Sequence, residues 1–290
     1  MFYNPNTKKE VDIMKELSPK EIAKKKDFYY NLRNIMLIAI IPILITYFIL
    51  SNLSKNPDFL TIAVIIGSAL IYYATLIIYY KKYYNKFYGI LFNQCDPIKY
   101  QKVLLAILEQ GRFRNKELDS ITIELSKAEY FSGEFESAEK ELRKVNINKH
   151  NNIFMIIDYY VALGNCYLSS KNKIGLLNIQ KKMLELDRKI NYKIIRRKRY
   201  KKVYNTCILI INNSIAILEN DDILLDLLHL ELNEAKSELQ KVKANYYIGL
   251  KYYELNELNL SEKHLEYAFE NGNTSFYAKE AEKLLGLMAV

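Results

Sequence analysis

The cysteines and histidines carry the most reactive side chains of this 290-residue chain, and they lie far apart in the sequence. A zinc site or a disulfide framework needs closely spaced ligands or paired cysteines. This spacing instead fits reduced thiols in a cytosolic compartment, and we expect no metal site and no cofactor. None of these residues belongs to a CxxC motif or a Cys/His cluster: Cys95, Cys166, Cys207, His150, His229 and His264.

Motifs that carry catalysis are also missing from the sequence. It contains no glycine-rich phosphate loop, no HExxH and no GxSxG pattern. The acidic residues at positions 219–222 lie where a turn between helices is expected. We therefore expect their carboxylates to cap helix ends rather than to act as a catalytic acid and base. The sequence therefore predicts a protein that is not an enzyme.

The stretch from Arg188 to Lys202 is strongly basic, within a chain whose net charge is +9. Three explanations compete. A solvated helix face or a loop between repeats is favoured first, and contact with an anionic membrane surface comes second. Contact with an acidic protein segment or with nucleic acid comes third. Nucleic acid is disfavoured because the sequence shows no recognised nucleic-acid-binding fold. The candidate anionic-surface patch consists of Arg196, Arg197, Lys198, Arg199, Lys201 and Lys202.

Composition predicts an all-α fold. Apolar residues make up 50% of the chain, whereas Gly occurs 9 times and Pro 5 times. So few helix breakers argue for long helices and against a turn-rich β protein.

Two long uncharged runs, residues 35–53 and 59–80, predict a transmembrane helical hairpin over residues 34–80. Lysines and arginines flank the pair on both outer sides, while Lys55 alone lies in the connection, so both termini are expected in the cytoplasm. The expected domains are a basic N-terminal segment (1–33), the hairpin (34–80) and a cytosolic helical domain (81–290). The N-terminal segment is expected to form a helix along or into the membrane, with Ser18 as N-cap and Glu21 completing a capping box.

The helical domain contains three similar segments, which begin at Ile121, Asp158 and Asn245. Their alignment superimposes Leu125, Leu163 and Ile248, then Ser126, Gly164 and Gly249, then Ala138, Leu176 and Ser261 on the second helix. This pattern resembles the tetratricopeptide repeat. Departures are Ser126 in place of glycine, Glu129 where tyrosine is expected, and Leu176 where a small residue is usual.

The resemblance implies a superhelix of stacked helix hairpins, an α-solenoid. Residues 203–236 are expected to supply a further degenerate hairpin, and the segment after Ser275 a capping helix. Gly164 and Gly249 would leave room for a partner helix, and Gly133 would serve a turn. The resemblance also implies a groove for a protein or peptide partner, and its alternative is a groove filled by the protein's own helices. The candidate groove residues are Lys127, Tyr130, Asn165, Leu168, Tyr246 and Tyr253.

These features together predict a membrane-anchored scaffold, which recruits a cytosolic protein through its superhelix. The alternative is a bacteriocin or toxin immunity protein, or a membrane sensor, whose spans meet a membrane-active peptide. Richness in Lys, Ile, Asn and Tyr hints at a bacterial source.

Overall fold

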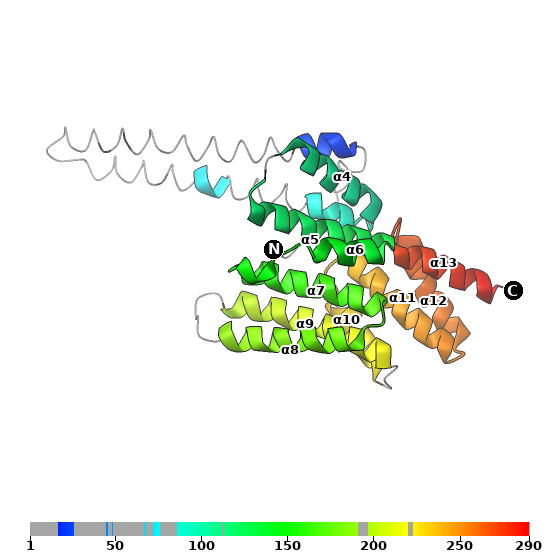
Figure 1. Ribbon diagram of the computed structural model, residues 1–290. Coiled ribbons are helices and arrows are strands. Elements are labelled where there is room, and N and C mark those ends of the chain that lie inside the picture. Colours follow the sequence, from blue (N-terminus) through cyan, green and yellow to red (C-terminus); the bar gives the residue numbers. More distant parts are fainter. Residues whose placement is uncertain are drawn as a thin grey trace.

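The computed structural model describes residues 17–25, 86–111, 113–190, 197–219 and 223–289, together with positions 45, 48, 67 and 72–75. Within these ranges the chain forms helices and turns and contains no strand, so the predicted all-α fold is confirmed for them (Figure 1). A short helix at residues 86–92 precedes the main series. That series comprises α4 (Pro97–Gln110), α5 (Asn115–Ser132), α6 (Phe135–Leu142), the 3₁₀ turn η1 (Ile147–Lys149), α7 (Ile153–Ser169), α8 (Lys173–Ile190), α9 (Arg197–Glu219), α10 (Leu224–Glu234), α11 (Glu238–Glu254), α12 (Leu258–Asn271) and α13 (Phe276–Met288).

Local capping residues define several helix ends. The Asp96 carboxylate accepts from the backbone N–H of Lys99, 3.0 Å away, and Pro97 begins α4. The Ser275 hydroxyl accepts from the backbone N–H of Ala278 at the start of α13. Both side chains satisfy helical N–H groups that have no partner within the helix. Gly133 ends α5 with φ of 100°, a left-handed conformation that costs glycine little.

The helices stack in chain order as antiparallel pairs. α5 packs on α6 and α7, α7 packs on α8 and α9, and α10 to α12 continue the array. The predicted hairpin at residues 203–236 is formed by α9 and α10. This arrangement is compatible with a helical repeat, because each pair buries its apolar faces against its neighbours in sequence.

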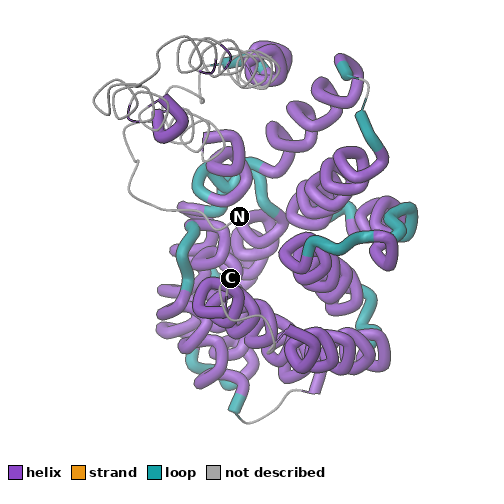
Figure 2. The backbone as a smooth tube through the Cα atoms, turned by 90° about the vertical axis from the view of Figure 1, so that its left-hand side faces the viewer, coloured by secondary structure: helices purple, strands orange, loops and turns teal. Residues whose placement is uncertain are grey.

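The first and last helices of the array also contact each other, which does not occur in an open solenoid. α13 packs against α5 as well as against α11 and α12, and Figure 2 shows the helices arranged around the molecule rather than in an open row. Asn273 donates to the carbonyl of Gln94, and the Thr274 hydroxyl donates to the Asp96 carboxylate at 2.8 Å. The turn before α13 is thereby bonded to the start of α4, and the predicted capping helix joins the two ends of the array.

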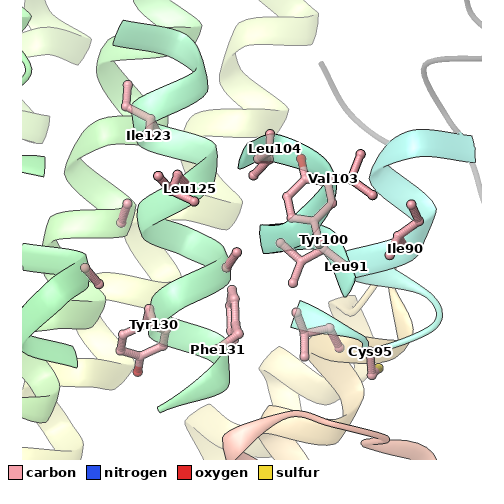
Figure 3. Packing of buried hydrophobic residues seen from close by; sticks show 14 of the residues in the cluster. Ile90, Leu91, Cys95, Tyr100, Val103, Leu104, Ile123, Leu125, Tyr130 and Phe131 are labelled. Carbon is pink, nitrogen blue, oxygen red and sulfur yellow. The ribbon is translucent and has the colours of Figure 1, made fainter. Parts of the chain in front are cut away.

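The largest apolar cluster lies where these ends meet. Figure 3 shows α4 between the helix at 86–92 and α5, with Tyr100 among its buried side chains. Tyr100 is fully buried, and its hydroxyl donates to Glu124 of α5. The same cluster includes Leu239 of α11 and Tyr277 of α13. The first and last helices therefore share one core, and a second cluster fills the space between α7, α8 and α9.

Gly164 and Gly249 both lie inside helices at close contacts. A Cβ on Gly249 would lie 2.8 Å from Cγ of Leu265 and 3.2 Å from its backbone nitrogen in the hairpin partner α12. A Cβ on Gly164 would lie 2.4 Å from Cδ1 of Ile211 in α9, but 3.7 Å from Leu176 in its own partner α8. The predicted close approach to the hairpin partner is thus confirmed at Gly249, whereas the neighbour closest to Gly164 belongs to the next pair.

The predicted N-terminal helix is present, but it packs on the helical domain. The Ser18 backbone N–H donates to Glu21, and the Glu21 N–H donates to the Ser18 hydroxyl, so the capping box is confirmed. Ile22 and Ala23 are fully buried in the largest core cluster. Residues 17–25 therefore lie against the helical domain, and the rest of the N-terminal segment, for which membrane contact is expected, lies outside the described residues.

The predicted transmembrane hairpin, residues 34–80, lies outside the described residues except at positions 45, 48, 67 and 72–75. Among the helices that the structure describes, none is both long and apolar enough to span a bilayer. This finding contradicts the predicted location as a multi-pass membrane protein with both termini in the cytoplasm. The prediction relied on the length of two uncharged runs at residues 35–53 and 59–80, whereas the helices that the structure describes over residues 97–288 are amphipathic, with charged residues on their exposed faces.

Replacement of Gly249 tests the packing of α11 on α12. We expect Gly249→Ala to lower the free energy of unfolding by about 1–3 kcal/mol, since the backbone of α12 must move. The matched control is Gly286→Ala in α13, where an added Cβ meets nothing within 4 Å and higher helix propensity should stabilise slightly. Urea unfolding followed by circular dichroism measures both, and equal effects at the two positions would contradict this packing.

Candidate functional site

Lys127, a predicted groove residue on α5, takes part in a buried ionic cluster. Its side chain is 9% exposed, and its Nζ lies 2.8 Å from Oε1 of Glu124 and 2.5 Å from Oδ2 of Asp158 on α7. Burial raises the pKa of Glu124, although Lys127 acts in the opposite direction. Burial also opposes the charge on Lys127, but Asp158 and Glu124 together raise its pKa. The lysine therefore stays charged and ties α5 to α7.

Two predicted groove tyrosines meet α13. Tyr130 of α5 and Tyr246 of α11 are buried, and both contact Tyr277. The hydroxyls of Tyr130 and Tyr277 are 3.2 Å apart, and the ring centroids of Tyr246 and Tyr277 are 5.4 Å apart. Burial raises the pKa of Tyr246 to about 12, so this hydroxyl stays protonated at neutral pH. The protein's own C-terminal helix thus covers the part of the groove expected at these tyrosines.

The other predicted groove residues are buried or half-buried. Asn165 and Leu168 of α7 are buried, and Tyr253 near the end of α11 is half-buried. The side-chain oxygen of Asn165 has no hydrogen-bond partner, which is uncommon for a buried amide. The structure therefore brings Tyr130 and Tyr246 together around α13 and places Lys127 in a separate ionic cluster.

The basic stretch is described only in part. Arg196 lies outside the described residues, and the side chains of Arg197, Lys198 and Arg199 at the start of α9 are likewise not described. Lys201 and Lys202 are exposed on α9. The patch stays a prediction, with these two lysines as its described members.

A hollow that the sequence analysis did not predict lies between the end of α6, the turn η1, and helices α7 and α8. We call it the α6–α8 hollow, and its volume is about 410 Å³. Lys182 contributes from α8, and its Nζ lies 5.7 Å from the centroid of the Tyr160 ring. The described residues that line it include no Asp or Glu: Arg143, Lys144, Val145, Asn146, Ile147, Asn148, Tyr159, Tyr160, Leu163 and Lys182.

Carboxylates next to the hollow partly neutralise its cations. Nη2 of Arg143 lies 2.5 Å from Oε1 of Glu139, and Lys144 pairs with Glu141. The side chains of Arg143 and Lys144 are nevertheless mostly exposed, at 67% and 58%. Exposed pairs of this kind contribute little to stability, so they exchange readily for another carboxylate. One signal for the hollow was present in the sequence, in the basic and amide-rich turn at residues 143–149 that follows a short helix.

The reactive side chains of the described residues are either dispersed or buried. No group of His, Cys, Asp and Glu side chains is placed there to hold a metal ion. All three cysteines are free and buried, and burial raises the pKa of Cys166 and Cys207 to about 12. These thiols therefore stay protonated at neutral pH and are poor nucleophiles.

Comparison of the chain with protein-family models, with curated proteins and with solved structures finds no match.

Removal of the Lys127 charge tests the ionic cluster. We expect Lys127→Met to lower the free energy of unfolding by about 3–5 kcal/mol, because Glu124 loses the cation that compensates its buried charge. The second change Glu124→Gln should restore part of this loss in a double-mutant cycle. Lys140→Met, at an exposed position on α6, is the control. Additive effects of the Lys127 and Glu124 substitutions would contradict the coupling.

Glu129 of α5 should make stability depend on pH. It is 6% exposed, one carboxylate oxygen has no partner, and burial raises its pKa to about 7 from 4.5. A raised carboxyl pKa means that the folded state binds the extra proton, so this contribution to stability is present below about pH 4.5 and is lost as pH rises through about 7.

The variant Glu129→Gln removes that dependence. Its stability relative to the unmodified protein should rise by roughly 1–3 kcal/mol between about pH 5 and pH 8 in urea unfolding. Glu136→Gln, which changes an exposed carboxylate on α6, should show no such rise. A constant difference across this pH range at position 129 would refute the assignment.

Proposed function

We propose that the protein is a non-enzymatic binding protein, in which tetratricopeptide-like helix hairpins present the α6–α8 hollow to an acidic segment of another protein. The observation that carries this proposal is the lining of the hollow, which combines three cations with two tyrosines and no acidic side chain among the described residues. Cations donate charge-assisted hydrogen bonds to carboxylates, and tyrosines anchor apolar side chains at protein interfaces.

Two features support the tetratricopeptide-like interpretation of the hairpins. The aligned residues Gly164 and Gly249 both lie at close helix contacts. The aligned residues Ala138, Leu176 and Ser261 are all fully buried on the second helix of their pairs. The second-helix positions of the pattern thus share a place in the packing, as expected for repeated units, whereas the two glycines contact different neighbouring helices.

The hollow is a better binding surface than the groove predicted from the resemblance. Tyr130 and Tyr246 are covered by α13, and Lys127 is already paired with two carboxylates. A partner at these residues would have to displace the C-terminal helix and expose a core residue, Tyr277. A partner at the α6–α8 hollow needs no such rearrangement.

Lys182 is the cation most available to a partner. It forms no ion pair with a described residue, and its ammonium group lies over the Tyr160 ring instead. An incoming carboxylate would bind this ammonium directly and would replace Glu139 or Glu141 at Arg143 and Lys144. Apolar side chains of the same segment would contact Tyr159 and Leu163 at the wall of the hollow.

Fluorescence anisotropy with a labelled peptide of alternating Glu and Leu tests this proposal. We expect the peptide to bind more weakly as salt is added, because the attraction is screened. The double variant Lys182→Glu with Arg143→Gln should weaken binding at least about tenfold.

Two controls make the result specific. The same peptide with Gln in place of Glu should bind less well, and Lys102→Glu on α4, which reverses an exposed cation outside the hollow, should leave binding unchanged. Equal binding of the Glu and Gln peptides, or full binding by the double variant, would rule out the hollow as an acidic-segment site.

A further inference from the structure

The outer face of α8 carries an apolar stripe that no described part of the chain covers. Ile174, Leu177 and Leu184 are 73%, 43% and 47% exposed. Their spacing in the sequence places them on one side of the helix, together with Lys181 and Arg188. α8 uses its other sides to pack on α7 and α9. We call these five residues the α8 stripe.

Cations outnumber carboxylates around the α8 stripe. Lys181, Lys182 and Arg188 are exposed on this helix, whereas among its described carboxylates Glu185 is exposed and Asp187 is half-buried. The stripe therefore combines exposed leucine and isoleucine side chains with a positive border, and its complement is an apolar helix face with a negative border.

The same chain presents such a face on α12. Leu258 and Phe269 are each 44% exposed, and the spacing of Glu262 and Glu266 places them between these two side chains on one side of the helix. Glu270 adds a further exposed carboxylate, against Lys263 as the exposed cation of this helix. We call Leu258, Glu262, Glu266 and Phe269 the α12 stripe.

The two stripes belong to separate parts of the molecule. Figure 1 shows α8 and α12 apart from one another, so one copy cannot join its own two stripes. Their lengths are compatible, because α8 has 18 residues and α12 has 14, which corresponds to about 27 and 21 Å. The α8 stripe of one copy can therefore lie along the α12 stripe of another.

We propose that the protein associates with further copies of itself through this α8–α12 contact. Apolar side chains supply the buried area, while Lys181 and Arg188 of one copy face Glu262 and Glu266 of the next. The contact is heterologous, since different surfaces meet, so it produces a closed ring or an extending chain of subunits rather than a symmetric pair. This inference does not depend on the proposed function of the α6–α8 hollow.

Reciprocal charge reversal tests the contact in the full chain, with size-exclusion chromatography and light scattering as the measurement of mass. The unmodified protein should form species heavier than one chain as its concentration rises, and added salt should reverse this. The basic-to-acidic variant Lys181→Glu/Arg188→Glu and the acidic-to-basic variant Glu262→Lys/Glu266→Lys should each raise the dissociation constant at least about tenfold.

Mixing the two variants provides the decisive comparison. The acidic α8 of the first variant meets the basic α12 of the second, so the mixture should regain association that neither variant shows alone. Recovery also shows that both variants are folded, and circular dichroism checks their helical content directly. The control Lys102→Glu/Lys140→Glu reverses two exposed cations on α4 and α6, outside both stripes, and should associate like the unmodified protein.

Three outcomes would overturn the proposal. In the first, the unmodified protein is a single chain at all concentrations. In the second, both reversal variants associate as the unmodified protein does. In the third, the mixture fails to recover association although each variant is folded. In the second case another surface joins the copies, and in the first and third the stripes serve no contact between copies.

Discussion

The contact of Tyr277 with both α5 and α11 is the interaction on which the rest of the structure depends. Each amphipathic helix pair leaves an apolar face that its neighbour must cover, and the first and last pairs of an open stack lack one neighbour. Here the C-terminal helix covers both, because Tyr277 packs between Tyr130 and Tyr246 and lies in the same core as Tyr100. The two ends of the array are thereby stabilised by each other.

That closure also decides where a partner can bind. Side chains that would line an inner groove of an open stack become core or ionic-cluster residues here, as Lys127 and Tyr130 do. The remaining surfaces suited to recognition lie outside the array, at the α6–α8 hollow and on the stripes of α8 and α12. The binding that we propose therefore uses these surfaces rather than an inner groove.

Features governed by neighbouring residues could be predicted from the sequence, and features governed by distant ones could not. Ser18, Ser275 and Gly133 act within a few residues of their own position, so their capping and turn roles were predictable. The burial of Tyr130 depends on Tyr277, far along the chain, and periodicity carries no information on that contact. The α6–α8 hollow likewise forms only when Lys182 of α8 comes to lie over Tyr160 of α7.

The membrane prediction illustrates a related limit. It used the length of uncharged runs, which measures the hydrophobicity of a segment and not its surroundings. Residues 17–25, which lie outside both runs, give an example of such surroundings, since Ile22 and Ala23 lie next to a lysine-rich sequence and are buried in a protein core. An apolar helix face can be buried against lipid or against other helices of the protein, and the hydrophobicity of the segment alone does not distinguish the two.

The bonds from Asn273 and Thr274 to the start of α4 have a consequence for how this protein can evolve. Open solenoids gain and lose repeats freely, because each unit needs only its nearest neighbours. In this chain an inserted or deleted hairpin would carry α13 away from α5 and leave both ends of the stack uncovered. The closure therefore constrains the number of helix pairs, so that substitution on the outer surface disturbs the array less than duplication of a pair.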